Sequence, residues 1–517
     1  MRKRLRKTAR KPGGNRNGSF EPLSWILRRV PAVIALIILY VSSAFSQILT
    51  LLHTNDLHAQ YLPLKSGKSR TGGMEALYET VLHECNASTI LLDAGDFQTG
   101  TLVSSLDENG VTGGGMVAMM NLLGVRASVP GNHEFDKGWR NLKAMEAVAG
   151  FGLLAANLSK GGRPFLQKTH LAVTAGGVRV GIIGLVSGKM DRLVFAGKRN
   201  GIEIENPASA ARRLVRALDP ETDLIVLLTH QGFHEDSLLA LAVPGADVII
   251  GGHSHTELKR PVRVGGVIIA QAGSRTQFLG RLDLTVQNDR VASFSGRLVP
   301  VRSNERPKDR RMRDLVENYR KRIESRYGVV IGRLKTAWKP VRDRESNVGN
   351  FFADVMAAAT GAEIAVVNSG AIRKGFSRGP LREMDLFEVC PFDNKLVRFS
   401  CSGRQVLQLI CANVAAAFSR NRGILQVSGL RYKAKKDERG MIRILDTSVN
   451  GGPVQTNRTY TVAAVDYLVP HNAREYFGFE PESYEPLDLE LTPAAVEYIR
   501  SHPVIRSRVE GRMRHER

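Results

Sequence analysis

The sequence predicts an α/β protein of two or more domains, and three observations carry this prediction. The chain has 517 residues, well above the roughly 100–200 residues of a single domain. With 43% hydrophobic and 24% charged residues, its composition excludes collagen-like, coiled-coil and mainly disordered chains. From residue 47 to about 301, short apolar runs alternate with amphipathic stretches of helical length, which is the α/β pattern.

Residues 1–46 have the composition of a signal peptide or other targeting segment. Lys and Arg crowd residues 2–29, and residues 30–45 are almost wholly apolar but shorter than the ~20 residues that a membrane span needs. Ala44 and Ser46 are small residues that predict cleavage before Gln47 and export to the periplasm or extracellular space, with no membrane span after cleavage. An uncleaved N-terminal membrane anchor is the alternative.

The net charge and the cysteines say little about which partners the chain binds or whether it contains disulfides. The formal charge of +23 favours anionic partners, without choosing among phosphorylated metabolites, nucleic acid and acidic membranes. Cys85, Cys390, Cys401 and Cys411 do not have the spacing of a zinc knuckle. In an oxidising compartment, a Cys401–Cys411 disulfide is one possibility.

Polar clusters follow five of the predicted strands, at residues 48–52, 89–92, 127–129, 224–228 and 248–250. Because ligands collect at the carboxyl ends of strands in α/β sheets, we expect these clusters to converge on one site. The candidate ligands in them are Asp56, His58, Asp96, Asn132, His230, His253 and His255. His53, in the first cluster, is interpreted as a structural hydrogen-bonding residue.

This set of oxygen and imidazole donors is large enough to surround two divalent metal ions. Two ions about 3.5–4 Å apart need a carboxylate that can bridge them, and Asp96 is the candidate. Histidines and carboxylates without a nearby cysteine favour Mn, Zn, Fe or Co over Ca or Mg.

Residues 305–327 are predicted to form a helix that links two domains, residues 47–304 and residues 328–517. Apolar residues recur there at helical spacing among many charges: Met312, Leu315, Val316, Tyr319 and Ile323. A solvated helix packed on one domain is the alternative. The second domain also has an α/β pattern, with strand candidates at 364–367 and 460–465 and a helix candidate at 403–417.

The chain resembles the calcineurin-like dinuclear metallophosphatases, and within them the secreted bacterial 5′-nucleotidases and UDP-sugar hydrolases. The motifs that carry the resemblance are Asp56-Leu57-His58, Gly95-Asp96, Gly131-Asn132-His133-Glu134, His230 and Gly252-His253-Ser254-His255. The resemblance implies an N-terminal β-sandwich flanked by helices and a C-terminal α/β substrate-binding domain. It also implies two metal sites, Asp56, His58, Asp96 and His255 for one and Asp96, Asn132, His230 and His253 for the other.

The resemblance further implies a catalytic dyad and a set of substrate contacts. His133 and Asp136 match the dyad, in which the histidine stabilises the phosphoryl group or assists the leaving oxygen. The C-terminal signatures supply Arg344, Asn368 and Arg373, and guanidinium groups suit phosphate oxygens. Phe392 and Tyr467 match the two aromatic residues that stack on a base.

Two departures from the family pattern concern the sugar and the first motif. The family usually has Gly-Gly-Asp after the second aromatic residue, and this chain has His471-Asn472-Ala473. We therefore expect poor discrimination between ribose and deoxyribose, and Ala473→Asp to restore the missing contact. Ala59 replaces a common glycine, which we expect to disturb the chemistry little.

The sequence thus predicts a metal-dependent phosphoester hydrolase with a small nucleotide as substrate and no nucleic acid polymer as partner. Release of phosphate from nucleoside monophosphates and cleavage of nucleotide sugars are the favoured activities. The alternatives are a 2′,3′-cyclic-nucleotide phosphodiesterase, another phosphomonoesterase, a two-manganese thiosulfohydrolase and a non-catalytic nucleotide-binding protein. Closure of the two domains about the linker is expected.

Overall fold

The computed structural model describes residues 46–66, 69–303, 309–392, 394–419, 422–469 and 472–516, and residues 47–517 form one compact unit. The predicted targeting segment lies outside the described residues, apart from Ser46. None of the helices in these described ranges combines the length and the apolar character that a membrane crossing needs.

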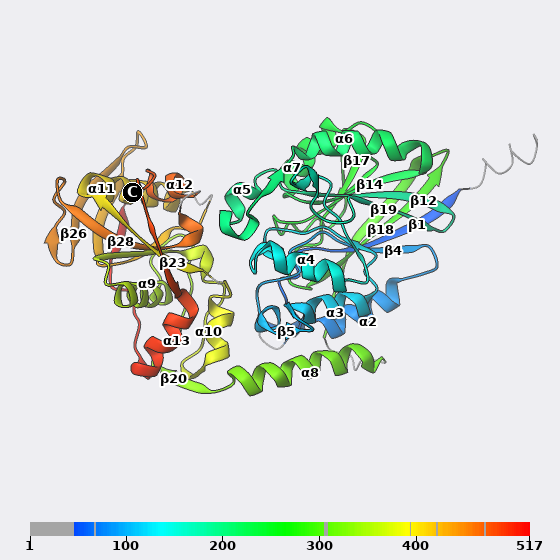
Figure 1. Ribbon diagram of the computed structural model, residues 1–517. Helices are drawn as coiled ribbons and strands as arrows, with labels where there is room; N and C mark the ends of the chain where they lie inside the picture. The colour runs from blue at the N-terminus through cyan, green and yellow to red at the C-terminus, as the bar shows by residue number, and fades with distance from the viewer. Residues whose placement is uncertain are drawn as a thin grey trace, which may run out of the picture. The chain divides into compact units, whose positions relative to one another are not determined.

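The N-terminal region contains two six-stranded sheets that lie face to face (Figure 1). The first has the order β19-β18-β1-β4-β7-β8, and the second has the order β11-β12-β14-β15-β17-β16. The first comprises β1 (Gln47–Thr54), β4 (Thr89–Asp93), β7 (Ala127–Ser128), β8 (Gly152–Leu153), β18 (Phe278–Gln287) and β19 (Arg290–Pro300). The second comprises β11 (His170–Ala175), β12 (Val178–Val186), β14 (Leu224–His230), β15 (Val248–Gly251), β16 (Val262–Val264) and β17 (Val267–Ala270).

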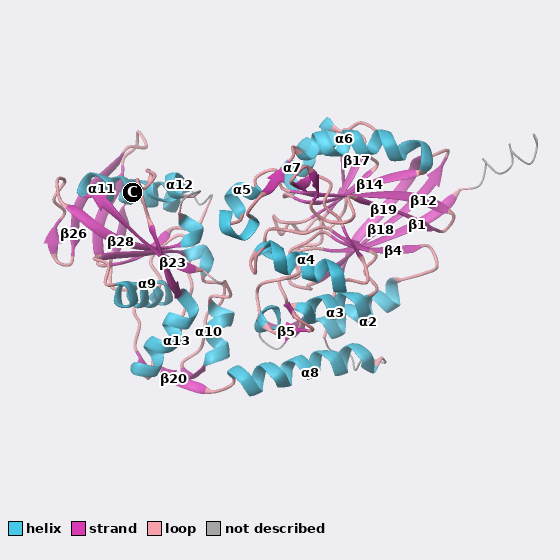
Figure 2. Ribbon diagram, in the orientation of Figure 1, coloured by secondary structure: helices cyan, strands magenta, loops and turns pink. Residues whose placement is uncertain are grey.

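The alternation of side chains along β14 places this second sheet between two apolar layers. Leu224, Val226 and Leu228 are buried in the core shared with the first sheet, whereas Ile225 and Leu227 belong to the core under the helices α6 (Pro207–Leu218) and α7 (Phe233–Ala242). Because successive strand residues point to opposite faces, both faces of β14 must be covered. The helices α2 (Met74–Glu84) and α3 (Gly114–Leu123) cover the first sheet (Figure 2). The predicted β-sandwich flanked by helices is therefore confirmed.

Shorter elements complete this region. They are β2 (Leu64–Ser66), β3 (Ser69–Thr71), β5 (Asp107–Glu108), β6 (Val111–Thr112), β9 (Leu158–Lys160), β10 (Arg163–Pro164), β13 (Ile202–Ile204), α4 (Trp139–Val148) and α5 (Met190–Leu193), with 3-10 turns η1 (Leu102–Ser105), η2 (His133–Phe135), η3 (Ala196–Arg199) and η4 (Asp219–Glu221).

The helix predicted at 305–327 is α8 (Arg310–Tyr327). Asp309 caps its N-terminus, because the Asp309 side chain accepts a hydrogen bond from the Arg311 backbone N–H. Four of its five predicted apolar residues are buried in the core of the first sheet: Met312, Val316, Tyr319 and Ile323. The fifth, Leu315, is partly buried. The helix contacts α2 and α3 of the N-terminal region and also α10 (Glu383–Val389) of the C-terminal region. Residues 304–308 are outside the described residues, and the domain boundaries stay a prediction.

The C-terminal region has a core of its own around a five-stranded sheet of order β24-β21-β28-β23-β29. The predicted strands at 364–367 and 460–465 are β21 (Ile364–Asn368) and β28 (Thr459–Val465), and the predicted helix at 403–417 is α11 (Gly403–Ser419). The other strands are β20 (Val330–Leu334), β22 (Gly379–Arg382), β23 (Lys395–Ser402), β24 (Leu425–Ser428), β25 (Leu430–Lys436), β26 (Ile442–Val449), β27 (Gly452–Pro453), β29 (Glu485–Glu490), β30 (Val504–Ile505) and β31 (Met513–Glu516). The other helices are α9 (Asn347–Thr360), α10 (Glu383–Val389), α12 (Ala473–Phe477) and α13 (Leu491–Ser501), with 3-10 turns η5 (Ser369–Ala371) and η6 (Asp466–Leu468).

The Cys401–Cys411 disulfide considered from the sequence is not formed. Cys401, buried on β23, and Cys411, half-buried on α11, are both free thiols. Burial raises the pKa of Cys401 to about 12. The thiolate that disulfide exchange requires is therefore disfavoured at this position.

Candidate active site

The predicted ligands come together at the carboxyl ends of strands from both sheets of the sandwich. β1, β4 and β7 run parallel in the first sheet, and β14 and β15 run parallel in the second. Three groups of side chains each have donor atoms within 4.8 Å of one another: Asp56, His58 and His255; His58, Asp96 and His133; and Asp96, His230 and His253. The convergence predicted from the sequence is confirmed.

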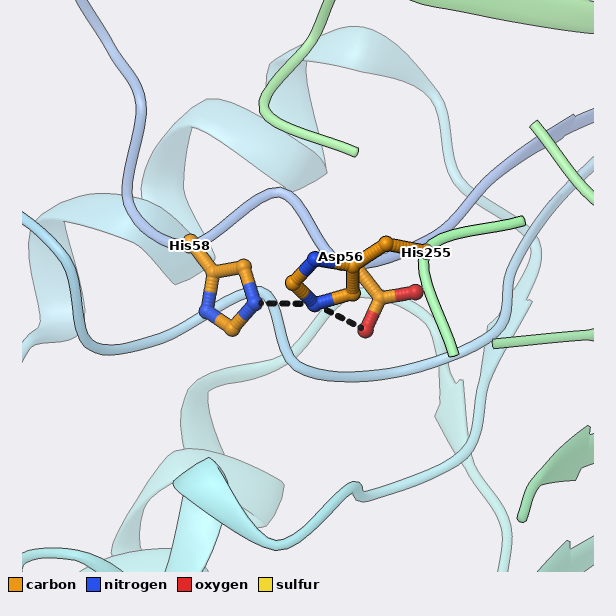
Figure 3. A group of neighbouring side chains, drawn as sticks. All are labelled: Asp56, His58 and His255. Atoms are coloured by element: carbon orange, nitrogen blue, oxygen red, sulfur yellow. Dashed lines mark hydrogen bonds and ion pairs between the residues drawn. The ribbon is translucent and has the colours of Figure 1, made fainter. Parts of the chain in front are cut away.

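The first group brings two imidazoles and a carboxylate to one point (Figure 3). His58 Nε2 lies 2.9 Å from His255 Nε2, and His255 Nε2 lies 3.4 Å from Asp56 Oδ1. His58 Nδ1 lies 3.1 Å from the carbonyl of Thr99, so a proton on Nδ1 would leave Nε2 with a free lone pair. The Nε2 atoms of His58 and His255, which face one another beside the Asp56 carboxylate, could together bind a cation.

The second group centres on His230 and Asp96. His230 Nδ1 lies 2.7 Å from the carbonyl of Ala94 and donates to it, and Nε2 lies 3.1 Å from Asp96 Oδ2. Apart from this contact with Asp96, buried His230 Nε2 has no partner in the described part of the chain. His253 Nδ1 lies 3.1 Å from Asn132 Oδ1. An imidazole nitrogen whose one contact is a carboxylate oxygen is an arrangement that a metal ion could complete.

Gly131 leaves room for this second group. A Cβ atom at Gly131 would lie 2.1 Å from Asp96 Oδ1 and 2.7 Å from His230 Nε2, so any larger residue would displace these donors. The residues present therefore fit a metal site on geometry as well as on donor chemistry. Asp96 belongs both to the group with His58 and to the group with His230. This is the position that a bridging carboxylate requires.

Burial sets the direction of the pKa shift for three of the candidate ligands, Asp56, His253 and His255. It raises the pKa of Asp56 to about 7 and lowers the pKa of His255 and of His253 to about 4, because each charged form loses hydration. Burial opposes the charged form of His230 as well, but the negative charges of Asp96 and Asp56 and the hydrogen bonds to Asp96 and to the Ala94 carbonyl together outweigh it and raise the pKa of His230 to about 10. The site therefore favours positive charge beside Asp96, which a metal ion would supply.

The ligand loops have strained backbones. Five of the seven predicted ligands have left-handed φ angles: Asp56 (51°), His58 (47°), Asp96 (54°), His253 (76°) and His255 (53°). Each such conformation costs roughly 1–2 kcal/mol for a residue with a Cβ atom, and persists only where the surroundings enforce it. Ala59 also has φ of 50°, so the glycine that it replaces would relieve strain without changing a ligand.

Glu134 is one of the groups that enforce this conformation. Its carboxylate accepts hydrogen bonds from the backbone N–H groups of Asp96 (3.0 Å), Gln98 (3.0 Å) and Gly131 (2.6 Å). One buried side chain thus holds the loops after β4 and β7 together. His53 is also buried, but its ring lies against Gly280 and its Nδ1 lacks a hydrogen-bond partner among described residues, so the expected hydrogen bond is not seen.

The predicted dyad is in place beside the candidate ligands. His133, in the turn η2, has its Nδ1 2.7 Å from Asp136 Oδ2, and its Nε2 lies 4.0 Å from Asp96 Oδ2. Burial opposes the charged form of His133, but Asp136 and Asp96 outweigh it and raise the pKa of His133 to about 9. Asp136 therefore fixes the ring so that Nε2 faces the candidate metal site.

A cavity of about 560 Å³ adjoins this site. Its lining includes His58 on the metal side, and Arg275, Arg373 and Phe392 further along. The ring of Phe392 stacks on His133 with 5.6 Å between centroids, and the Arg373 guanidinium lies 5.7 Å from the Phe392 centroid. Arg373 and Phe392, two of the predicted substrate-binding residues, thus line the cavity.

The other predicted substrate residues are placed differently. Tyr467 is 39% exposed and does not line the cavity, and the Asn368 side chain is buried with an Oδ1 that has no partner within the described ranges. Arg344 is exposed, and among the described residues its guanidinium has no hydrogen bond or ion pair. Its backbone carbonyl accepts a hydrogen bond from Gln426 Nε2 (3.0 Å).

The structure corrects the expectation for Ala473. The Ala473 methyl group is 0% exposed in the C-terminal core, at the first residue of α12. An aspartate there would point into apolar surroundings rather than toward a sugar. The neighbouring Asn472 side chain donates to the carbonyls of Tyr467 (2.8 Å) and Arg192 (3.2 Å), so it too is engaged.

Two arginines near the site were missed from the sequence. Burial, together with the charges of Arg275 and Arg342, lowers the pKa of Arg373 to about 10, so both arginines lie close to it. Arg342 stands two residues before Arg344, and the sequence pattern could not choose between them. Arg275 follows the apolar run of β17 in a polar turn, which is the same signal that identified the metal ligands.

Two protein families match the chain. The calcineurin-like phosphoesterases match residues 49–257, and the 5′-nucleotidase C-terminal domain matches residues 330–477. Together, these matches cover more than half of the chain.

Individual proteins are similar over most of the chain. A trifunctional nucleotide phosphoesterase protein of Bacillus subtilis is 29% identical over 81% of this chain, which spans only 32% of that relative. The crystal structure of a 5′-nucleotidase precursor from Thermus thermophilus is 28% identical, covers 91% of this chain and 99% of its own, and has a TM-score of 0.76. A sulfate thiohydrolase from a Thermus species is 20% identical over 90% of this chain and 96% of its own, with a TM-score of 0.72, which shows a shared fold alone.

Proposed function

We propose that this chain, which belongs to the calcineurin-like phosphoesterases with a C-terminal 5′-nucleotidase domain, releases phosphate from nucleoside 5′-monophosphates or cleaves nucleotide sugars. The chain is a metal-dependent phosphoester hydrolase; the nucleotide identity, the number of metal ions and the residue roles are parts of the proposal.

One observation carries the proposal: Asp96 belongs to two groups of metal-ligand type, and one of these groups includes His133, which is paired with Asp136. In this assignment, Asp56, His58, Asp96 and His255 would hold one ion, and Asp96, Asn132, His230 and His253 the other. Two divalent ions of Mn, Zn, Co or Fe would stabilise charge on phosphoryl oxygens and assist water as the nucleophile when bound.

His133 acts on the reacting phosphate in this proposal. Its Nδ1 is held by Asp136 at 2.7 Å, which directs Nε2 toward the metal side of the cavity. From there, Nε2–H can donate a hydrogen bond to a phosphoryl oxygen or a proton to the leaving oxygen. Asp136 orients the ring and favours its charged form.

The C-terminal region supplies recognition of the leaving group. Arg373 reaches the cavity and offers a planar fork to phosphate oxygens, while Phe392 and Tyr467 stack on the base. Arg344 and Asn368 are proposed to bind substrate as well. Because Phe392 now stacks on His133, binding of a base on this face requires Phe392 to leave His133, in keeping with the predicted motion of the two domains.

The first experiment combines metal analysis with a substrate panel. The purified protein is expected to contain two equivalents of divalent metal and to release phosphate from AMP and UMP, or to split UDP-glucose, faster than a simple aryl phosphate. Preferred cleavage of a 2′,3′-cyclic nucleotide would favour a phosphodiesterase, and release of sulfate from a thiosulfate ester would favour a thiosulfohydrolase. Tight nucleotide binding without turnover by the metal-loaded protein would contradict an enzymatic role.

We also propose export of the chain, with loss of residues 1–46. The support is the run of basic residues followed by the apolar stretch and by Ala44 and Ser46. Mass spectrometry of the protein from the producing cells is expected to find Gln47 at the N-terminus. An intact N-terminus on a membrane-bound protein would indicate the anchored alternative.

A further inference from the structure

The C-terminal region contains a three-stranded sheet of order β22-β20-β30 that is covered on one side. α13 lies against β20 (Figure 1), and a Cβ atom at Gly332 would come within 2.5 Å of the Ile499 side chain of that helix. Leu334, Leu381 and Ile505 are buried in the C-terminal core. Because successive strand residues point to opposite faces, the residues between these lie on the other side of the sheet.

The other side of this sheet presents valines and cations to solvent. Val330 is 57% exposed and Val504 is 54% exposed. Arg333 pairs with Val504 in the register, and the next exposed pair along the two strands is Lys335 and Arg506. We call these five residues the basic sheet face.

Hydrogen bonds fix the two strands that carry the basic sheet face. The backbone N–H groups of Arg333 and Lys335 donate to the carbonyls of Pro503 (2.7 Å) and Ile505 (2.9 Å). Beyond the strands, Thr336 Oγ1 donates to the carbonyl of Ser507 (2.7 Å). The backbone therefore holds the cations of both strands side by side before any partner binds.

The chain segments around this face carry charge of one sign. Residues 329–336, 378–382 and 503–508 contain six Lys or Arg and no Asp or Glu. Arg382 has an acidic neighbour, since its guanidinium lies 3.8 Å from a carboxylate oxygen of Glu324 on α8. The side chains of the other five have no ion pair or hydrogen bond within the described ranges: Arg333, Lys335, Arg378, Arg506 and Arg508. Their charge remains available to an external anion.

The apolar part of the face favours lipid over nucleic acid as that anion. Exposed valines gain free energy when an apolar phase covers them, and nucleic acid phosphates provide none. Proteins that hold single-stranded nucleic acid stack its bases on aromatic side chains, and the three segments contain no Phe, Tyr or Trp. Apolar side chains set among cations are typical of surfaces that lie in the headgroup region of a membrane.

We propose that the basic sheet face binds the surface of a membrane that contains anionic lipids. Its cations contact the lipid phosphates, and Val330 and Val504 contact the outer ends of the acyl chains. None of the five residues lines the cavity beside the candidate metal ligands, so this contact is separate from the proposed hydrolytic site. It determines where the chain works rather than which bond it breaks.

Sedimentation with vesicles tests the charged part of the face. The chain from Gln47 onward forms a compact unit without the basic residues 2–29. It is expected to bind vesicles of equal parts phosphatidylglycerol and phosphatidylcholine at least about tenfold more tightly than vesicles of phosphatidylcholine alone. Lys335→Gln combined with Arg506→Gln is expected to lower binding to the charged vesicles about 25-fold, which is about fivefold for each cation. High salt should weaken the wild type likewise.

A matched control separates this face from the net charge of the chain. Lys259→Gln combined with Arg260→Gln removes the same charge from exposed positions of the N-terminal region and is expected to change vesicle binding less than about twofold. Equal losses in the two double variants, or equal binding of the wild type to charged and neutral vesicles, would overturn the proposal. Phosphate release and thermal unfolding should match the wild type in both variants, so failure of the proposed function leaves this test intact.

The valines distinguish a lipid surface from another polyanion. Val330→Thr combined with Val504→Thr keeps β-branched residues on the strands and is expected to weaken binding to the charged vesicles at least about fivefold. Vesicle binding that is unchanged in this variant would overturn the contact with acyl chains. Binding of the wild type to a DNA duplex, without binding to the charged vesicles, would overturn the lipid proposal in favour of nucleic acid.

Discussion

The proposed metal-ligand loops of the N-terminal region and the proposed recognition residues of the C-terminal region differ in how firmly the chain holds them. Asp56, Asp96 and His230 are at most 2% exposed and contact one another or the loops between them, whereas Tyr467 is 39% exposed. Glu134 ties two of the ligand loops together through three backbone hydrogen bonds. If the proposed roles hold, most groups for the reaction are arranged before substrate binds, while Tyr467 on the recognition side can still adjust.

The difference has a physical basis in what each region must do. Groups that stabilise charge in a transition state act best when they need no reorganisation, and strained ligand loops locked by hydrogen bonds provide this. Recognition of a base by stacking tolerates small shifts, because every base presents a flat face. Substitutions among the ligands should therefore reduce all activities together, and substitutions among the recognition residues should act on some substrates only.

Asp96→Asn gives the strongest test of the firmly held region. Asparagine offers a single neutral oxygen and cannot neutralise two cations, so we expect loss of metal and a fall in hydrolysis of at least about 10²–10³-fold for every substrate. Metal analysis and phosphate release measure the two effects. Asp314→Asn, at an exposed position on α8, serves as the matched control. Two bound metals with near-normal turnover would rule out the bridging role.

His133→Asn separates chemistry from metal binding within the same region. We expect metal content to stay intact while kcat falls by about 10²–10⁴-fold, because the change removes proton transfer or charge stabilisation but no proposed ligand. The measurement is kcat for a nucleotide and for glycerol phosphate alongside the metal content. Loss of metal in this variant would make His133 a ligand.

Ala473→Asp tests the structural account of the C-terminal core. Because the Ala473 side chain is fully buried among apolar residues, a carboxylate there is expected to lower the free energy of unfolding by roughly 3 kcal/mol or more, rather than to create a ribose contact. Thermal and urea unfolding measure the loss, with Ala473→Ser as a smaller polar comparison. A stable variant with a new preference for AMP over dAMP would instead support the sequence-based expectation that an aspartate at position 473 binds the ribose.

Phe392→Ala and Tyr467→Ala test whether recognition is confined to one class of substrate. Loss of one base stack is worth ~1–3 kcal/mol, so KM for nucleotides is expected to rise between about fivefold and 10²-fold. KM for glycerol phosphate, which has no base, should change much less. Equal weakening of both substrates would show that these two aromatic residues are structural, and the contrast between the regions would fail.

The comparison of AMP with dAMP is expected to give the smallest effect. Ala473 points into the core and Asn472 donates to the carbonyls of Tyr467 and Arg192, so neither is free to bind the ribose hydroxyls as the protein stands. A site that forms no bond to a hydroxyl cannot penalise its absence, so kcat/KM for the two nucleotides should agree within about threefold. A strong native preference for AMP would show that another residue binds the sugar.

The parts of the site that the sequence predicted share one property, which is that they depend on local order along the chain. Asp56, His58, Asp96 and His230 each stand at or just after the end of an apolar run, and the structure places all four at strand ends. The strands at 364–367 and 460–465 were visible for the same reason. Arg275 had this signal too, but a single arginine in a turn is most often a surface charge, and only its place in the cavity distinguishes it.

The sequence by itself determined the α/β class, the candidate ligands and their order along the chain, because apolar periodicity and motif spacing are local properties of a polypeptide. Only the tertiary structure decided that the ligands come from two different sheets, that Ala473 faces the core, that Cys401 and Cys411 stay apart as thiols, and that Arg275 and Arg373 share a cavity. These facts depend on which surfaces meet after folding. Burial and long-range packing set them, and neither can be read from residues that stand hundreds of positions apart.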